Sequence, residues 1–234
     1  CSPRIRLGRS VWNCLRALPG RSPLQAAYSW SPALARGTSR LVKDAGFDAI
    51  HVEHLRGARY GLSVQPVLKK TGRSRPALVW DSVDCISTLF RQAASEARTR
   101  RSRLTARIEL PRTERFEGWL TTQFDRVLVT SEKDRRDLLR LAGRRTGEGG
   151  AAAAAGRVAV LPNGVDLDYF SPSGEPRDPR AIVITGKMSY HANVAAVTRF
   201  VEEVMPEVWN AIPEARLWIV GQNPPNEVRR LAAQ

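Results

Sequence analysis

The sequence has few of the residues that build metal centres or disulfide frameworks. Its 234 residues include three histidines and three cysteines, and Cys1, Cys14 and Cys85 lack the spacing of a metal site. An odd number of scattered cysteines favours reduced thiols, so we expect a cytoplasmic protein. No apolar run reaches the roughly 18 residues of a membrane-spanning helix. The glycine-rich dinucleotide fingerprint is also missing, which disfavours a dehydrogenase.

Positive charge is abundant but unevenly distributed. Residues 1–150 contain 29 Lys and Arg against 14 Asp and Glu, a net charge of +15, whereas residues 151–234 carry −1. Nucleic acid, an anionic membrane surface and an arginine-rich genome composition are competing explanations, and the preponderance of arginine supports the last. We expect no nucleic-acid partner, because no aromatic residue interrupts the basic run. A peripheral membrane contact stays open for that run, which comprises Arg98, Arg100, Arg101, Arg103 and Arg107.

Short apolar runs alternate with helical segments along most of the chain. The runs predict buried strands at 47–52, 77–80, 124–130, 158–161, 181–185 and 216–220. The segments between them predict helices at 34–45, 57–70, 86–141 with interruptions, and 194–209 with a kink near Pro206. Residues 144–156 predict a loop with a helical piece, and residues 1–40 a helix and loops. Strands that alternate with helices indicate an α/β protein with parallel sheets.

Prolines and charges at residues 171–180 indicate a linker between two domains. We expect a first domain at 1–161, a crossover and linker at 162–180, and a second domain at 181–234. The chain begins with Cys1 instead of Met and ends soon after a helix begins. We therefore expect a fragment in which the first domain is incomplete and the second is present only as its first strand–helix–strand unit.

The stretch from Val158 to Pro172 gives the most specific indication of function. A buried strand ends at Pro162 and is followed by Asn163-Gly164, a pair that readily adopts positive φ. Asp166 then precedes an irregular segment in which Tyr169 and Phe170 are expected to act as hydrophobic anchors. An ordinary strand, turn and loop would also satisfy this pattern. As a string, however, Pro-Asn-Gly-Val-Asp followed by Tyr-Phe-x-Pro resembles the interdomain crossover of family 4 glycosyltransferases.

That resemblance implies a GT-B fold, in which two Rossmann-like domains with parallel sheets are joined at this crossover. It also implies transfer of a sugar from a nucleotide-sugar, a co-substrate and not a cofactor, to an acceptor hydroxyl with retention of configuration and no essential metal. Members of the family often use glycan or lipid-linked acceptors in cell-surface polysaccharide or glycolipid biosynthesis. The pair Asp166 and Asp168 has the spacing of a metal motif but lies in the crossover, so we expect no metal site.

Polar residues lie at the carboxyl end of the first predicted strand, where ligands of open α/β sheets collect. His51, Glu53, His54 and Arg56 make up this group, and it resembles the Asp-x-x-His-x-His strand end of the transferases. We expect these residues on the acceptor side. The alternative is that His51 is an ordinary strand histidine and that Glu53 pairs with Arg56.

The next strand ends in Asp81-Ser-Val-Asp-Cys85. Many members of the family have a histidine in this loop, and Val83 stands at that position here. We therefore expect Asp84 to be the catalytic base and Asp81 to lie on the acceptor side, since a positioned carboxylate can accept a hydroxyl proton. Asp84 as the N-cap of the following helix is the alternative.

In the second domain, glycine directly after a strand allows close approach to a ligand, and a lysine beside it suits a diphosphate. We expect Gly186, Lys187, Asn193 and Gly221 to bind the donor. The family's two donor-binding glutamates would lie beyond Gln234, so we expect no sugar transfer by this chain alone. Two other functions stay open, a sugar-nucleotide epimerase of related architecture and a non-enzymatic basic module that binds membrane or nucleic acid.

Overall fold

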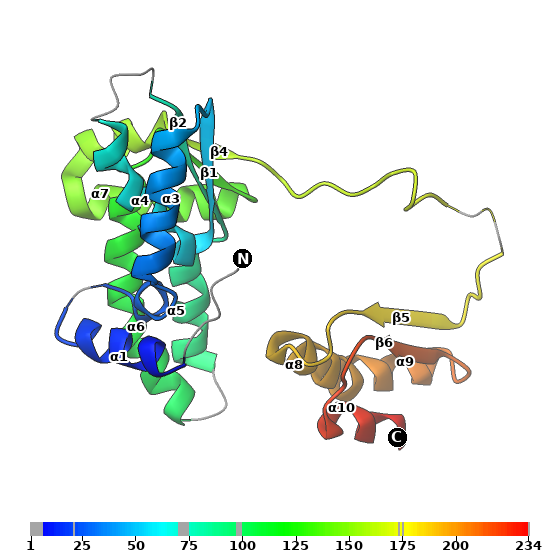
Figure 1. Cartoon of the computed structure of the whole chain (residues 1–234). Coiled ribbons are helices and arrows are strands. Elements are labelled where there is room, and N and C mark those ends of the chain that lie inside the picture. Colours follow the sequence, from blue (N-terminus) through cyan, green and yellow to red (C-terminus); the bar gives the residue numbers. More distant parts are fainter. Residues whose placement is uncertain are drawn as a thin grey trace. The chain divides into compact units, whose positions relative to one another are not determined.

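The chain divides into two compact units, residues 1–164 and residues 165–234 (Figure 1). The structure is a computed structural model that describes residues 7–20, 22–69, 75–96, 100–172, 174 and 176–233. The first unit contains, in chain order, α1 (Leu7–Ala17), α2 (Leu24–Tyr28), α3 (Pro32–Asp44), β1 (Ala49–Glu53), α4 (His54–Leu68), β2 (Ala77–Val83), α5 (Ile86–Glu96), α6 (Arg100–Leu120), β3 (Arg126–Val129), α7 (Glu132–Ala155) and β4 (Val158–Val160). The second contains β5 (Ala181–Thr185), α8 (His191–Arg199), a π-helical turn (Phe200–Val204), α9 (Met205–Ala211), β6 (Arg216–Val220), α10 (Asn226–Arg230) and a 3-10 turn (Leu231–Ala233).

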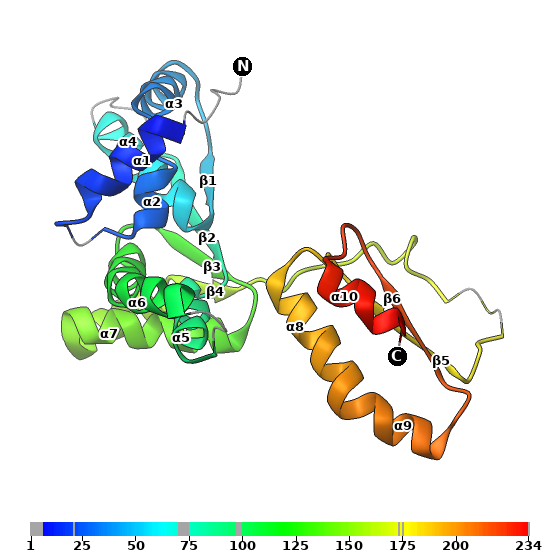
Figure 2. The same ribbon diagram turned by 90° about the horizontal axis from the view of Figure 1, so that it is seen from below.

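Each unit has its own parallel sheet, so the predicted α/β class is confirmed. The first sheet has the order β1-β2-β3-β4, and the second pairs β5 with β6. In the first sheet, the register between β2 and β3 shifts between Asp81 and Val83. Figure 2 shows α8 and α9 following one another along one side of the second sheet. Both sheets follow the Rossmann-like pattern of parallel strands joined by helices.

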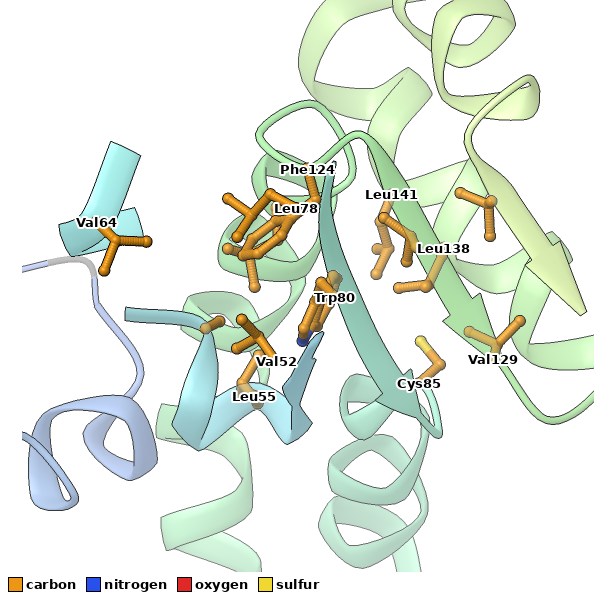
Figure 3. Packing of buried hydrophobic residues seen from close by; sticks show 14 of the residues in the cluster. Val52, Leu55, Val64, Leu78, Trp80, Cys85, Phe124, Val129, Leu138 and Leu141 are labelled. Carbon is orange, nitrogen blue, oxygen red and sulfur yellow. The ribbon is translucent and has the colours of Figure 1, made fainter. Parts of the chain in front are cut away.

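The core of the first unit lies on one face of its sheet. Alternate strand residues, such as Leu78, Trp80 and Val129, are fully buried there against helix residues (Figure 3). Trp80 and Phe124 pack with ring centroids 6.0 Å apart. The intervening strand residues on the opposite face stay exposed or half-buried. Each fully buried side chain of this size contributes about 1.5–3 kcal/mol, so this one face supplies most of the unit's stability.

Two helical segments differ from their predicted form. Residues 144–156 belong largely to α7, which continues to Ala155 across a break at Gly147, where φ is 70°. The prediction of a loop gave too little weight to the helix propensity of the alanine run, since alanine is the strongest helix former. The helix predicted at 194–209 is divided by the π-helical turn at Phe200–Val204. Pro206 follows directly, and its missing N–H accounts for the expected interruption.

A buried carboxyl group fixes the start of α5. Glu117 of α6 is fully buried, and its two oxygens accept hydrogen bonds from Ile86 N (2.7 Å) and Ser87 N (3.0 Å). Asp134 of α7 accepts from Cys85 N (3.0 Å), while its own N–H donates to Ser131 Oγ, which confirms Ser131 as an N-cap. Burial raises the pKa of Glu117 to about 7, although the α5 amides oppose the shift. Glu117 therefore exchanges a proton near neutral pH.

The direction of the Glu117 pKa shift predicts how the stability of the first unit depends on pH. Because the folded state holds the proton of Glu117 more tightly than the unfolded state, its contribution to stability is largest below the ordinary carboxyl pKa and is lost as the pH rises through about 7. Between pH 5 and pH 8 we expect the free energy of unfolding to fall through this group by on the order of 2 kcal/mol. In Glu117→Gln this part of the pH dependence should vanish.

Urea unfolding followed by circular dichroism at both pH values measures the effect. Glu132→Gln is the control, because Glu132 is exposed at the start of α7 and should retain the wild-type dependence. An unchanged pH dependence in Glu117→Gln would contradict the assignment.

Candidate functional site

One predicted pair of acceptor-side residues is assembled on the first sheet. His51 and Asp81 lie on the neighbouring parallel strands β1 and β2, and His51 Nε2 is 3.2 Å from Asp81 Oδ2. The His51 side chain is 55% exposed and that of Asp81 is 22% exposed, on the face opposite to the core. The other oxygen of Asp81 accepts from Val83 N (3.0 Å). A carboxylate held in this way can orient an imidazole that accepts or donates a proton.

The carboxyl end of β2 has an unusual backbone. Val83 adopts a positive φ of 63°, and its carbonyl accepts from both Thr130 N (2.9 Å) and Thr130 Oγ1 (3.0 Å). A β-branched residue pays steric strain at positive φ, so several contacts are needed to hold it there. The bond from Val83 N to Asp81 is one of them. Asp81 therefore connects the strained turn at Val83 to the pair that it forms with His51.

Asp84 does not join this pair. Its side chain is exposed, and no donor in the described part of the chain lies within hydrogen-bond distance of its carboxylate. The alternative role of Asp84 as a helix N-cap is wrong, because Glu117 binds the first amides of α5. Only the backbone of Asp84 is fixed, by Ser82.

The remaining residues of the first strand end pair locally. Glu53 ends β1, and its Oε1 lies 3.6 Å from Nε2 of His54, so its partner is His54 and not Arg56. His54 begins α4 with a positive φ of 59°. Arg56 is exposed, and its carbonyl accepts from Ser29 Oγ (3.3 Å). No contact within the described residues connects His54 or Arg56 to the His51–Asp81 pair.

In the second unit, the segment after β5 wraps around the start of α8. The carbonyl of Lys187 accepts from Tyr190 N (2.9 Å) and from Asn193 Nδ2 (3.2 Å), while Lys187 itself is exposed. Asn193 thus fixes the loop. Tyr190 occupies the N-cap position of α8 without a side-chain cap bond. An uncapped helix N-terminus beside a lysine can bind an anion such as a diphosphate.

Gly186 and Gly221 bring the carboxyl ends of β5 and β6 together. Gly186 N donates to Val220 O (3.0 Å), and a Cβ at Gly221 would overlap the carbonyl oxygen of Gly186. Met188 is buried beneath this contact. Gly221 is therefore required by packing.

The crossover differs from its predicted geometry. Neither Asn163 nor Gly164 has a positive φ. Asp166 Oδ1 accepts from Asp168 N and Tyr169 N, both at 3.0 Å, so this carboxylate closes a local turn. Tyr169 and Phe170 are 78% and 66% exposed and contact each other edge to face, so the expected anchoring in a core is not found.

No conventional metal cluster or membrane span emerges from the described residues. Groups of three or more His, Cys, Asp or Glu side chains that could hold a metal are absent from that part of the chain. None of its helices is long and apolar enough to cross a membrane. Cys14 and Cys85 are free thiols, and Cys1 lies outside the described residues.

Comparison with known proteins assigns no family. Neither a family model nor a curated protein matches the chain.

The contact between Gly186 and Gly221 predicts a local effect of substitution. Gly221→Ala should destabilise the second unit by about 1–3 kcal/mol, because the added methyl group overlaps a backbone oxygen that cannot move freely. Amide exchange in β5 and β6 should accelerate accordingly, and exchange in β1–β4 should not. The matched control is Gly164→Ala, since an added Cβ there meets no atom within 4 Å. Equal exchange rates in β5 for both variants would refute the predicted clash.

Proposed function

We propose that this chain is part of a GT-B glycosyltransferase, which transfers a sugar from a nucleotide-sugar to an acceptor hydroxyl. The observation that carries the proposal is the string from Pro162 to Asp166, which resembles the family's crossover. It occurs at the junction of two compact units, each of which contains a parallel sheet. The predicted GT-B assignment, the cytoplasmic location and the glycan or lipid-linked acceptor are parts of this proposal.

The geometry favours His51 over Asp84 as the residue that accepts the proton of the acceptor hydroxyl. Asp81 contacts the imidazole at 3.2 Å and is itself held by a backbone amide, so the pair is pre-positioned. Asp84 is exposed and has no group to orient it among the described residues. Pre-positioning matters, because a general base must meet the hydroxyl at hydrogen-bond distance in the transition state. Asp81 acts through His51 and is a positioning residue.

The segment from Gly186 to Asn193 supports binding of the donor diphosphate. Its backbone is fixed by the bonds to the Lys187 carbonyl, while Lys187 stays exposed at the uncapped start of α8. A lysine is a compact charge that suits a phosphate group. Its contribution should be similar in the ground state and in the transition state, so it would affect binding more than turnover.

Kinetics of the gene product that contains this chain test these roles. In sugar transfer from nucleotide-sugar donors, His51→Gln should lower kcat by about 10²–10⁴-fold, since it removes general-base catalysis. Lys187→Ala should raise the donor KM about tenfold with little change in kcat. Lys43→Ala, which alters an exposed lysine of α3, is the control.

Asp84→Asn separates the two candidate bases. It should leave kcat nearly unchanged if His51 accepts the proton. Loss of turnover in Asp84→Asn together with normal turnover in His51→Gln would restore Asp84 as the base. Conversion of a nucleotide-sugar without any acceptor would instead indicate the epimerase.

A further inference from the structure

Helix α1 is amphipathic, but the side that packs on the first unit is its polar side, unlike in most surface helices. It packs on the first unit with its small and polar side, where Ser10 is buried and Asn13 Nδ2 donates to Trp30 O (2.8 Å). Its apolar side faces outward, with Leu7, Val11, Trp12 and Leu15 between 51% and 69% exposed. Apolar stripes of surface helices ordinarily face the core. The outer face of α1, comprising Leu7, Val11, Trp12, Leu15 and the adjoining Leu18, is left without a partner in this structure.

Basic residues border this face. Arg9 and Arg16 are exposed on α1, and neither α1 nor the first half of α6 (100–108) contains an acidic residue. The C-terminal end of α1 contacts α6, because Arg112 of α6 donates to Ala17 O (3.1 Å). Glu109 of α6 accepts from Leu24 N of α2 (2.9 Å). Leu104 and Ile108 precede Arg112 at four-residue steps and are 61% and 46% exposed. Both helices thus carry exposed apolar residues and arginines, and these arginines form no ion pair within the described residues.

A polar cavity lies on the inner side of α1. It has a volume of about 340 Å³, and Asn13, Arg16, Trp30 and Arg59 contribute to its lining. The Arg59 guanidinium lies 4.6 Å above the Trp30 ring, which fixes its position. Neither Arg16 nor Arg59 forms an ion pair with a carboxylate of the described residues. Two arginines without a counter-charge, in a cavity of this size, suit a phosphate group.

We propose that the outer face of α1, with the first half of α6, docks on an anionic lipid bilayer, and that the cavity takes a lipid phosphate. Helices with an apolar side, a tryptophan and flanking arginines lie in the interfacial layer of a membrane. A second copy of this chain fits less well, because it would oppose Arg9 and Arg16 to their own copies. Nucleic acid would satisfy the arginines but would leave the leucines and Val11 exposed to water. This proposal does not rest on sugar transfer.

Co-sedimentation of the 234-residue chain with vesicles tests the docking surface. Vesicles of equal parts phosphatidylcholine and phosphatidylglycerol should bind the chain, vesicles of phosphatidylcholine alone should bind it far less, and salt should weaken binding. Val11→Asp combined with Leu15→Asp should reduce binding by at least about tenfold, because both side chains would enter the apolar layer. The matched control is Leu41→Asp, which alters an apolar residue of α3 that is 56% exposed.

The arginines are tested separately. Arg16→Gln and Arg59→Gln should each weaken binding about fivefold, whereas Arg40→Gln on α3 should not. Circular dichroism verifies that each variant is folded. Undiminished binding of the Val11→Asp, Leu15→Asp variant would overturn the proposal. So would a dimer that this variant dissociates in the absence of vesicle binding, or thermal stabilisation by inorganic phosphate without vesicle binding, which would assign the cavity to a soluble anion.

Discussion

The bond between the Glu117 carboxyl group and the first amides of α5 is the contact on which the geometry of the first unit depends. It fixes where α5 begins and therefore how the chain leaves β2. The chain leaves through Val83 at positive φ, a conformation held by Thr130 on one side and by Asp81 on the other. Asp81 in turn contacts His51. A buried carboxyl group is thus linked, through the exit of the chain from β2, to the exposed pair.

The pKa of Glu117 shows which force dominates at this contact. Two backbone donors at a helix N-terminus favour the ionised carboxylate, and burial favours the neutral acid. Burial is the larger effect, because the pKa is raised to about 7. The same burial, together with the nearby Glu117 charge, raises the pKa of the Cys85 thiol to about 11, so this cysteine stays a neutral core residue. The contacts of Glu117 therefore hold α5 in place, and Cys85 is not suited to thiol chemistry.

Local features of the fold could be predicted from sequence, and features that join distant segments could not. The strands and the N-cap Ser131 follow from neighbouring residues, and both were found where expected within a few positions. The bond from Glu117 to Ile86 spans 31 positions, and that from Asp134 to Cys85 spans 49. No periodicity encodes such distances. For the candidate site, the polar strand ends could be recognised from sequence, but the strand pairing that places His51 and Asp81 on one face could not.

Helix α1 shows why an apolar pattern alone does not reveal what a helix packs against. Val11, Trp12, Leu15 and Leu18 form a regular stripe, and in most proteins such a stripe would predict contact with the core. Here the core-facing side contains the buried Ser10 together with Asn13 and Cys14, which donate to the carbonyls of Trp30 and Leu24. A helix attached by its polar side gains little from burial and leaves its apolar side available. Together with the positive charge of residues 1–150, this arrangement supports the proposed docking of the exposed stripe on a surface that is both apolar and anionic.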